Sequence, residues 1–452
     1  MAWGTKDIRG ERRGDAMLEA IVAKGSLVLR KVGGGRAGEI AAGRFLDHDD
    51  VTVEAIMATS AERTLAAAAG RTVLAIHDTS EVNFKGRAAR RTGLGPAGDG
   101  VSPGFFCHPL LLVDVEHEAV LGLVAADIWT RDAAPVGDRA KRAIVDKESR
   151  RWLDATQACA KIAETAARVI SVADREADIY QHFSARPANV DMIVRARHDR
   201  ATAGGTALFA MPQTFDLMAV CDVHVPSRGL SHKGSGDKGR IAHVSIKAGR
   251  VEIVRPKKPG CDAGPPTLVL NLVEIAEIEP PAGTQPLCWR LLTTLPVATL
   301  AEATAVAKMY RLRWRIEQLF RTLKSDGLDL EASQVCEAQR LFKLAAFGLI
   351  AAARIMQLVD ARDGSPRPAT DVIAVEHVDA IAALSKSLEG KTARQQNPHA
   401  KGSLAWVSWV TARLGGWNCY YKPPGPKTMA DGWHRLVDRL AGFALARAVR
   451  DV

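Results

Sequence analysis

Two short apolar segments of this 452-residue chain each end in an aspartate. Residues 72–78 read TVLAIHD, and residues 169–174 read VISVAD. Continuous apolar runs of this length, rich in β-branched residues, are typical of strands that are buried on both faces. Helix-like sequence precedes each run, which is the alternation expected of an α/β protein. The two segments therefore predict an α/β fold in which two buried strands each end in an acid.

The remaining sequence divides into regions with different patterns. Helices are expected over residues 1–72, 147–168, 300–324, onward to about 362, and after a linker at 363–368, with an interruption at 423–426. Further strands are expected at residues 110–114, 119–125, 191–197 and 289–294. Val, Ile and Thr recur at strand spacing over residues 199–287, which predicts a β-rich insertion. Residues 85–109 are rich in Gly, Pro and Arg and are expected to form a long basic loop.

These patterns predict three regions. A helical region covers residues 1–72, a central α/β domain covers residues 73–362 and is interrupted by the insertion at 199–287, and a second helical region covers residues 363–452.

Composition excludes several protein classes. Hydrophobic residues make up 47% of the chain and charged residues 25%, which is globular composition and does not fit a disordered, collagen-like or coiled-coil protein. The apolar stretch from Leu344 to Met356 is broken by Arg354 and is too short to span a membrane. The N-terminus shows no apolar segment of the kind found in signal peptides. We therefore expect a protein without a membrane partner.

Cysteine spacing and net charge indicate the compartment and the kind of partner. The seven cysteines are scattered and form no C-x-x-C pair, which argues against a zinc ribbon and against a secreted disulfide scaffold. We therefore expect a cytoplasmic protein. There are 61 Lys and Arg residues against 51 Asp and Glu, a net charge of +10, which suggests a polyanionic partner such as nucleic acid.

Three acids are candidates for chemistry. Asp78 and Asp174 each follow a predicted strand, and α/β enzymes place ligands at the carboxyl ends of strands because the loops there can converge. An Asp in this position also serves commonly as a turn residue or a helix N-cap. Glu317 is the single acid among six basic residues between Lys308 and Lys324.

The helix expected at 300–324 carries Glu317 in a cationic row. Tyr310, Arg313, Glu317 and Lys324 fall within a sector of about 60° on a continuous helix, at about 100° per residue. The apolar residues beside this row predict the core face: Leu312, Ile316, Leu319, Phe320 and Leu323. A solvated, salt-bridged face is the alternative, although such a face normally mixes both signs of charge.

Three carboxylates from separate elements are able to hold Mg²⁺ or Mn²⁺, since these hard cations prefer oxygen ligands. Two such ions activate the attacking oxygen and stabilise the leaving oxygen in phosphoryl transfer. The neighbouring Arg and Lys residues would then position the phosphodiester.

These residues resemble the DDE transposases of the insertion sequence four family, to which the transposon five transposase belongs. The family signature Tyr-x2-Arg-x3-Glu-x6-Lys is present at residues 310–324, and the block Asp-Arg-Glu-Ala-Asp is present at residues 174–178. Asp78 precedes Thr-Ser, as the first acid of the family does. Residues 147–152 and 314–317 are also similar to family sequences.

The resemblance implies an RNase H-like core, with a mixed β-sheet flanked by helices and a β-rich insertion between the second Asp and the Glu. It implies cut-and-paste transposition: nicking at inverted-repeat ends, a DNA hairpin intermediate, and joining of the 3′-OH ends to target DNA. Asp78, Asp174 and Glu317 would be the ligands of two Mg²⁺ ions, or of Mn²⁺. Tyr310, Arg313 and Lys324 would hold a phosphate.

The resemblance implies further DNA contacts. Trp289 would stack on a flipped base, although plain core packing explains a Trp there equally well. Arg195 matches a phosphate-contacting Arg of the family, with Arg197 as the alternative. Arg321 would contact DNA, or would be an ordinary surface Arg. Asp178 is expected to support its turn.

The same resemblance implies the partners. They are transposon-end DNA, target DNA and a second copy of the chain, which forms a homodimer in the synaptic complex. Residues 1–72 would contact the ends, and residues 363–452 would mediate dimerisation. The loop at 85–109 would hold DNA, or would be an ordinary flexible loop. In a bacterium the protein would associate with the nucleoid.

Two other functions stay open. One is a catalytically silent DNA-binding inhibitor or a domesticated transposase-derived protein. The other is an RNase H-fold nuclease without strand transfer.

Overall fold

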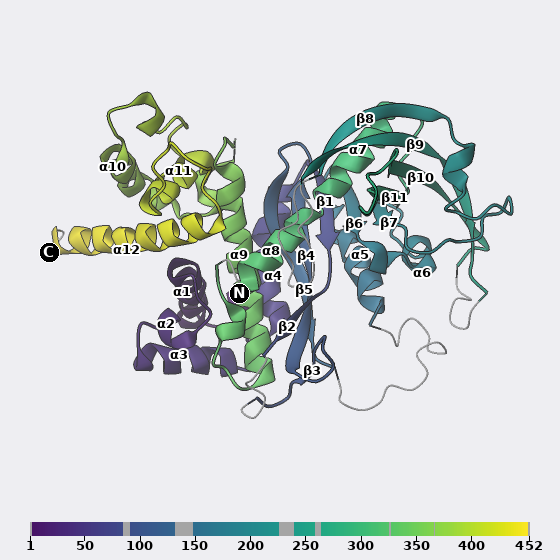
Figure 1. Cartoon of the computed structure of the whole chain (residues 1–452). Coiled ribbons are helices and arrows are strands. Elements are labelled where there is room, and N and C mark those ends of the chain that lie inside the picture. Colours follow the sequence, from purple (N-terminus) through teal and green to yellow (C-terminus); the bar gives the residue numbers. More distant parts are fainter. Residues whose placement is uncertain are drawn as a thin grey trace. The chain divides into compact units, whose positions relative to one another are not determined.

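The computed structural model describes residues 2–84, 91–131, 148–225, 239–257, 264–324, 327–365 and 367–450 (Figure 1). The chain separates into two compact units, and each is built from more than one stretch of sequence. Unit 1 comprises Met1–Arg71, Asp78–Pro135 and Trp314–Val452, and unit 2 comprises Thr72–His77 and Val136–Arg313.

Unit 2 is built on a mixed sheet. Its strands lie in the order β1, β6, β7, β11, β10, β9, β8. The pairs β1–β6 and β6–β7 are parallel, whereas all later pairs are antiparallel. The strands span Thr72–His77 (β1), Arg168–Ala173 (β6), Val190–Arg195 (β7), Leu217–Val225 (β8), Arg240–Val254 (β9), Thr267–Glu277 (β10) and Cys288–Thr293 (β11).

Both apolar runs form strands, as their sequences predict, and the structure makes the two strands neighbours. β1 and β6 run parallel, with Ile76 opposite Val172, so both strands end at the same edge of the sheet. Almost all of their side chains are buried. Helix α5 (Arg150–Ile162) packs against β1, β6 and β7, and α7 (Leu300–Arg311) packs against β9, β10 and β11 (Figure 1). A short helix, α6 (Tyr180–Ser184), lies beside α5.

The β-rich reading of residues 199–287 is confirmed for the part of it that the structure describes. The strands β8, β9 and β10 form an antiparallel group. This group continues the sheet, because β10 also pairs with β11 through Asn271 opposite Thr293. Burial along β9 alternates over much of its length, which is the pattern of a strand with one face toward the core.

Unit 1 is organised around one long helix, α9 (Ala338–Ala361), which packs against β5 and against helices from both ends of the chain. Among the described residues, α9 alone is long and apolar enough to cross a membrane, but 83% of its apolar window is buried inside the protein, as in a core helix. The other helices are α1 (Ile8–Lys24), α2 (Leu29–Val32), α3 (Arg36–Asp47), α4 (Val53–Ala68), α8 (Trp314–Lys324), α10 (Val378–Leu388), α11 (Leu404–Leu414) and α12 (Pro426–Arg450).

The strands of unit 1 correct the prediction of a loop at residues 85–109. β4 (Pro103–Asp114) begins within that range and pairs with β2 (Ser80–Asn83), β3 (Gly95–Pro96) and β5 (Ala119–Trp129). Residues 85–90 lie outside the described residues. Gly104 lies in a Gly- and Pro-rich stretch that suggests a loop, but strand β4 requires glycine at this position. A Cβ there would lie 2.3 Å from the carbonyl oxygen of Val82.

The single long helix expected at 300–324 is also wrong. α7 ends at Arg311 and α8 begins at Trp314. Between them, the N–H groups of Leu312 and Arg313 donate to carbonyls three residues back, those of Met309 and Tyr310. Neither Gly nor Pro occurs between 300 and 324, so no helix-breaking residue in the sequence marks this break. The row of Tyr310, Arg313, Glu317 and Lys324 therefore does not lie on one continuous helix.

Candidate active site

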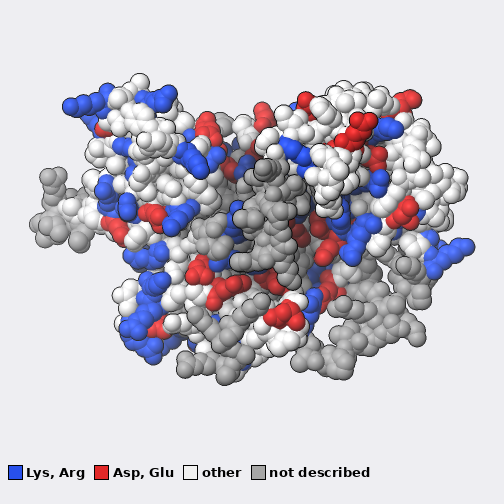
Figure 2. Space-filling view, in the orientation of Figure 1, with Lys and Arg blue, Asp and Glu red and all other residues white. Residues whose placement is uncertain are grey.

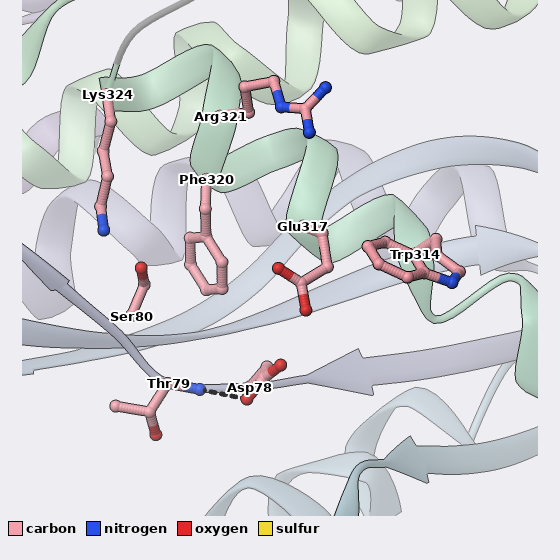
Figure 3. Close-up of a pocket in the computed structure, with 8 residues that line it drawn as sticks. All are labelled: Asp78, Thr79, Ser80, Trp314, Glu317, Phe320, Arg321 and Lys324. Atoms are coloured by element: carbon pink, nitrogen blue, oxygen red, sulfur yellow. Dashed lines mark hydrogen bonds between the residues drawn. The ribbon is translucent and has the colours of Figure 1, made fainter. Parts of the chain in front are cut away.

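Two of the three candidate acids line one pocket of unit 1. The pocket has a volume of about 340 Å³ and is lined by Asp78, Thr79, Ser80, Trp314, Glu317, Phe320, Arg321 and Lys324. Asp78 and its neighbours come from the segment that leads into β2, and the other lining residues come from α8 (Figure 3). In Figure 3 the Glu317 carboxylate points from α8 toward the segment that carries Asp78.

The pocket is flanked by cations and by an exposed aromatic ring. The Lys324 side chain extends toward Ser80, and Arg321 lies one turn before it on α8 (Figure 3). Trp314, 58% exposed, stands at the other end of the lining residues. Sequence reasoning assigned no site role to Trp314, because a pattern of residues does not reveal which aromatic ring is left exposed.

Arg315 fixes α8 within unit 1. Its guanidinium forms an ion pair with Asp360 of α9 at 2.6 Å and donates to the carbonyl of Glu118, between β4 and β5, at 2.8 Å. Burial raises the pKa of Asp360 even though Arg315 lies beside it. The neighbouring Ile316 is fully buried. Because residues 315 and 316 are anchored in this way, Glu317 is presented to the pocket from a fixed helix.

The turn after β1 holds Asp78 through its own backbone and through a buried histidine. The N–H of Thr79 donates to Asp78 Oδ1 at 2.8 Å, and the Thr79 hydroxyl lies 2.9 Å from His108 Nδ1 on β4. His108 is only 3% exposed. Sequence reasoning missed His108 because its contact with Thr79 spans 29 residues and depends on the strand pairing.

Asp174 begins a tight turn in unit 2. It is the N-cap of a 3-10 helix, η4 (Arg175–Ala177), and its Oδ1 accepts the N–H of Glu176 at 2.8 Å. This is the N-cap role that the sequence left open for an acid after a strand. Capping uses one carboxylate oxygen, so it does not conflict with metal binding by the other.

The remaining predicted residues of unit 2 gather around Tyr310. Burial raises the pKa of Tyr310; the charges of Arg313 and Arg195 oppose this shift, and the charge of Asp174 adds to it. The guanidinium carbon of Arg313 lies 6.0 Å from the centroid of the Tyr310 ring. The structure therefore brings together residues that are up to 139 positions apart in the sequence.

Two further contacts complete this group. The Trp289 and Tyr310 rings meet edge to face, with centroids 5.4 Å apart. Arg195 donates to the carbonyl of Cys288 at 2.9 Å, and burial lowers the pKa of Arg195. Trp289 is half-buried, so it is neither a full core residue nor a free surface ring. Arg197, the alternative to Arg195, is exposed.

Asp178 closes the Asp-Arg-Glu-Ala-Asp block and is structural, as predicted. Its side chain is fully buried and pairs with Arg200 at 2.6 Å. It also accepts the N–H groups of Arg197 and His198, at 2.7 and 2.9 Å. One carboxylate thus ties the turn after β6 to the segment after β7.

The donor set of the pocket fits a hard divalent cation. Asp78 and Glu317 offer carboxylate oxygens, and the residues lining this pocket include neither His nor Cys. Within the described ranges, no group of three or more His, Cys, Asp or Glu side chains is gathered closely enough to hold a metal ion. Asp78 and Glu317 belong to unit 1, and Asp174 belongs to unit 2.

His182, on α6, makes the stability of unit 2 depend on pH. Burial lowers its pKa to about 4, against 6.5 in an unfolded chain. Between pH 6.5 and 4, His182 therefore binds a proton in the unfolded chain but not in the folded protein. We expect the free energy of unfolding to fall as the pH drops from about 6.5 to about 4, by about 3 kcal/mol from this group.

The measurement is urea unfolding at several pH values, for the wild type and for His182→Phe. The variant should lose this part of the acid sensitivity. Equal slopes between pH 6.5 and 4 in both proteins would show that His182 is not held neutral.

Comparison with known protein families matches residues 154–354 to the transposase DDE domain. The matched range is a little under half of the chain and contains Asp174 and Glu317, together with the residues around Tyr310. Asp78 lies outside the matched range. Its assignment to the site rests on its position in the pocket that Glu317 also lines. The mixed sheet flanked by helices and this match together confirm the predicted RNase H-like α/β fold. Residues 154–354 are thus similar to a transposase DDE domain.

Proposed function

We propose that this protein is a cut-and-paste DNA transposase of the insertion sequence four type. The observation that carries the proposal is the pocket in which Asp78 and Glu317, from separate elements, face each other beside Lys324. The match of residues 154–354 to the transposase DDE domain supports it. The protein would cleave inverted-repeat ends through a hairpin and join the 3′-OH ends to target DNA.

Asp78, Glu317 and Asp174 would hold two Mg²⁺ ions, or Mn²⁺. When bound, these ions would activate the attacking oxygen and stabilise the leaving oxygen. Lys324 and Arg321 would bind the phosphates of the strand that is cut, since both side chains border the pocket. Arg315 would keep Glu317 in place by anchoring α8 to Asp360.

The group around Tyr310 would grip the DNA at the hairpin. Arg195 and Arg313 would contact a phosphate, and their closeness to Tyr310 supports this role. Trp289 would stack on an unpaired base, because its half-buried ring is held edge-on by Tyr310 and is not enclosed in the core.

The N-terminal helices would bind the transposon end. Figure 2 shows Lys and Arg side chains running over α1–α3, at the lower left. The exposed basic residues of these helices are Arg9, Arg12, Arg13, Lys24, Arg30, Lys31, Arg36 and Arg44. Phosphate contacts of this kind supply affinity without sequence preference. Residues 363–452 would mediate the dimer, and the nucleoid of a bacterium would be the place of action.

The test is cleavage of labelled DNA that carries the element's own end and flank. Mg²⁺ should support nicking followed by a hairpin and then strand transfer, and EDTA should abolish every cleavage product while DNA binding persists.

Two other results of this cleavage test would each indicate a different function. DNA binding without cleavage in any metal would indicate a catalytically silent DNA-binding protein. Metal-dependent nicking without a hairpin or strand transfer would indicate a nuclease of the same fold.

A further inference from the structure

A continuous chain of buried polar side chains runs through unit 2 behind the Asp174 turn. His77 Nε2 lies 3.0 Å from the Ser171 hydroxyl, which lies 3.0 Å from the Thr156 hydroxyl. Thr156 lies 2.7 Å from His182 Nε2, and His182 Nδ1 lies 3.0 Å from the carbonyl oxygen of Ala177. The four side chains belong to residues that are at most 1% exposed.

The last contact fixes the direction of every hydrogen bond in the chain. A carbonyl oxygen only accepts, so His182 must carry its proton on Nδ1. Burial lowers the pKa of His182 to about 4, so the ring is neutral at pH 7 and its Nε2 accepts. The Thr156 hydroxyl therefore donates its single hydrogen to Nε2 of His182. Ser171 must then donate to Thr156, and His77 must donate to Ser171.

The two ends of this chain lie beside the candidate acids. Ala177 is the last residue of η4, the turn that Asp174 caps, and His77 directly precedes Asp78. Thr156 lies on helix α5 and Ser171 lies on strand β6, so their hydrogen bond links these two elements. The side-chain network therefore connects one core helix to the turn that presents Asp174.

The η4 turn needs such support because it is a single turn. Its own backbone contributes two long hydrogen bonds, from the N–H of Ala177 to the carbonyl of Asp174 at 3.2 Å and from the N–H of Asp178 to the carbonyl of Arg175 at 3.3 Å. The His182 ring adds a donor from outside the turn. A donor of this kind keeps a ligand-bearing turn in one conformation, as outer-shell partners do at metal sites.

We propose that Thr156 and His182 are positioning residues that hold the Asp174 turn in its metal-binding conformation. This inference rests on the proposed function, since it takes Asp174 to be a metal ligand. His182 contacts the turn, and Thr156 acts through His182 by keeping its ring in the tautomer that donates to Ala177.

The test compares Thr156→Val with Thr156→Ser in the full-length protein. Valine has the shape of threonine but no hydroxyl, whereas serine keeps the donor. Thr293→Val is the matched control, because Thr293 is also fully buried and donates to the carbonyl of Met192 at 2.7 Å, on another part of the sheet. His182→Phe is the second variant if Thr156→Val does not fold.

Two measurements report on the turn without relying on cleavage. Binding of Mn²⁺, followed by electron paramagnetic resonance of the free ion, should weaken about tenfold to a hundredfold in Thr156→Val and in His182→Phe. Thr156→Ser should stay within about twofold of the wild type, and Thr293→Val should not change Mn²⁺ affinity. The ¹⁵N shifts of His182 should show the Nδ1–H tautomer in the wild type and a change in Thr156→Val.

The outcomes separate this inference from the proposed function. Equal Mn²⁺ affinity in Thr156→Val, Thr293→Val and the wild type would overturn the positioning role alone. A wild-type protein that binds no Mn²⁺ would overturn the proposed function and this inference with it. Weakened Mn²⁺ binding that serine rescues would support the role.

Discussion

Replacing Glu317 with glutamine should lower the rate of metal-dependent DNA cleavage by at least about a thousandfold, which corresponds to about 4 kcal/mol of lost transition-state stabilisation. Glutamine keeps the size of the side chain and one carbonyl oxygen but removes the negative charge. Glu317 faces Asp78 across a pocket that Lys324 also lines, so the removed charge is half of the carboxylate pair of unit 1. The loss should therefore appear in the rate of the cleavage step.

Binding of the transposon end should be unchanged in the same variant when it is measured in EDTA, by electrophoretic mobility shift. The matched control is Glu116→Gln, an exposed acid of unit 1 between β4 and β5, which should cleave like the wild type. Cleavage by Glu317→Gln within tenfold of the wild type would contradict its role as a metal ligand. Weaker end binding with a proportionate loss of cleavage would instead place Glu317 in the DNA-binding surface.

The sequence predicted the elements that bear the candidate acids because their signals are local. The runs before Asp78 and Asp174 are short, apolar and β-branched, and each became a buried strand that ends one residue before its acid, at His77 and Ala173. The core face of α8 was also predictable, since Ile316, Leu319 and their apolar neighbours are buried. Local periodicity is enough for such features because burial of one face follows directly from it.

The features that the sequence did not reveal depend on contacts between distant residues. No Gly or Pro lies in the sequence at the break between α7 and α8, so no local signal predicts it. The strand at Gly104 looked like part of a loop because the requirement for glycine comes from Val82 on the neighbouring strand. The anchors of the site, such as Arg315 on Asp360, join positions that no local pattern connects.

The other large effect is expected on stability. Asp178→Ala should lower the free energy of unfolding of unit 2 by about 3–5 kcal/mol, because it leaves the buried guanidinium of Arg200 without its counter-charge. It also leaves the N–H groups of Arg197 and His198 without their acceptor. The thermal transition should fall by about 10 °C, as measured by calorimetry of the full-length protein.

A small series of variants separates the two causes. Asp178→Asn keeps an acceptor oxygen for the backbone N–H groups and removes the charge, so it should lose less stability than Asp178→Ala. Adding Arg200→Met to Asp178→Ala should recover part of the loss, because no unpaired buried charge then remains. It should not recover all of it, since the two N–H groups still lack an acceptor.

The control is Asp154→Ala, which removes an exposed ion pair with Arg150 on α5. This change should cost less than about 1 kcal/mol, because solvent screens the pair. An Asp178→Ala loss as small as that of Asp154→Ala would contradict the structural role of Asp178. A large loss in stability combined with unchanged Mn²⁺ affinity in the protein that remains folded would show that Asp178 supports the fold of the turn, whereas Thr156 and His182 set its metal-binding conformation.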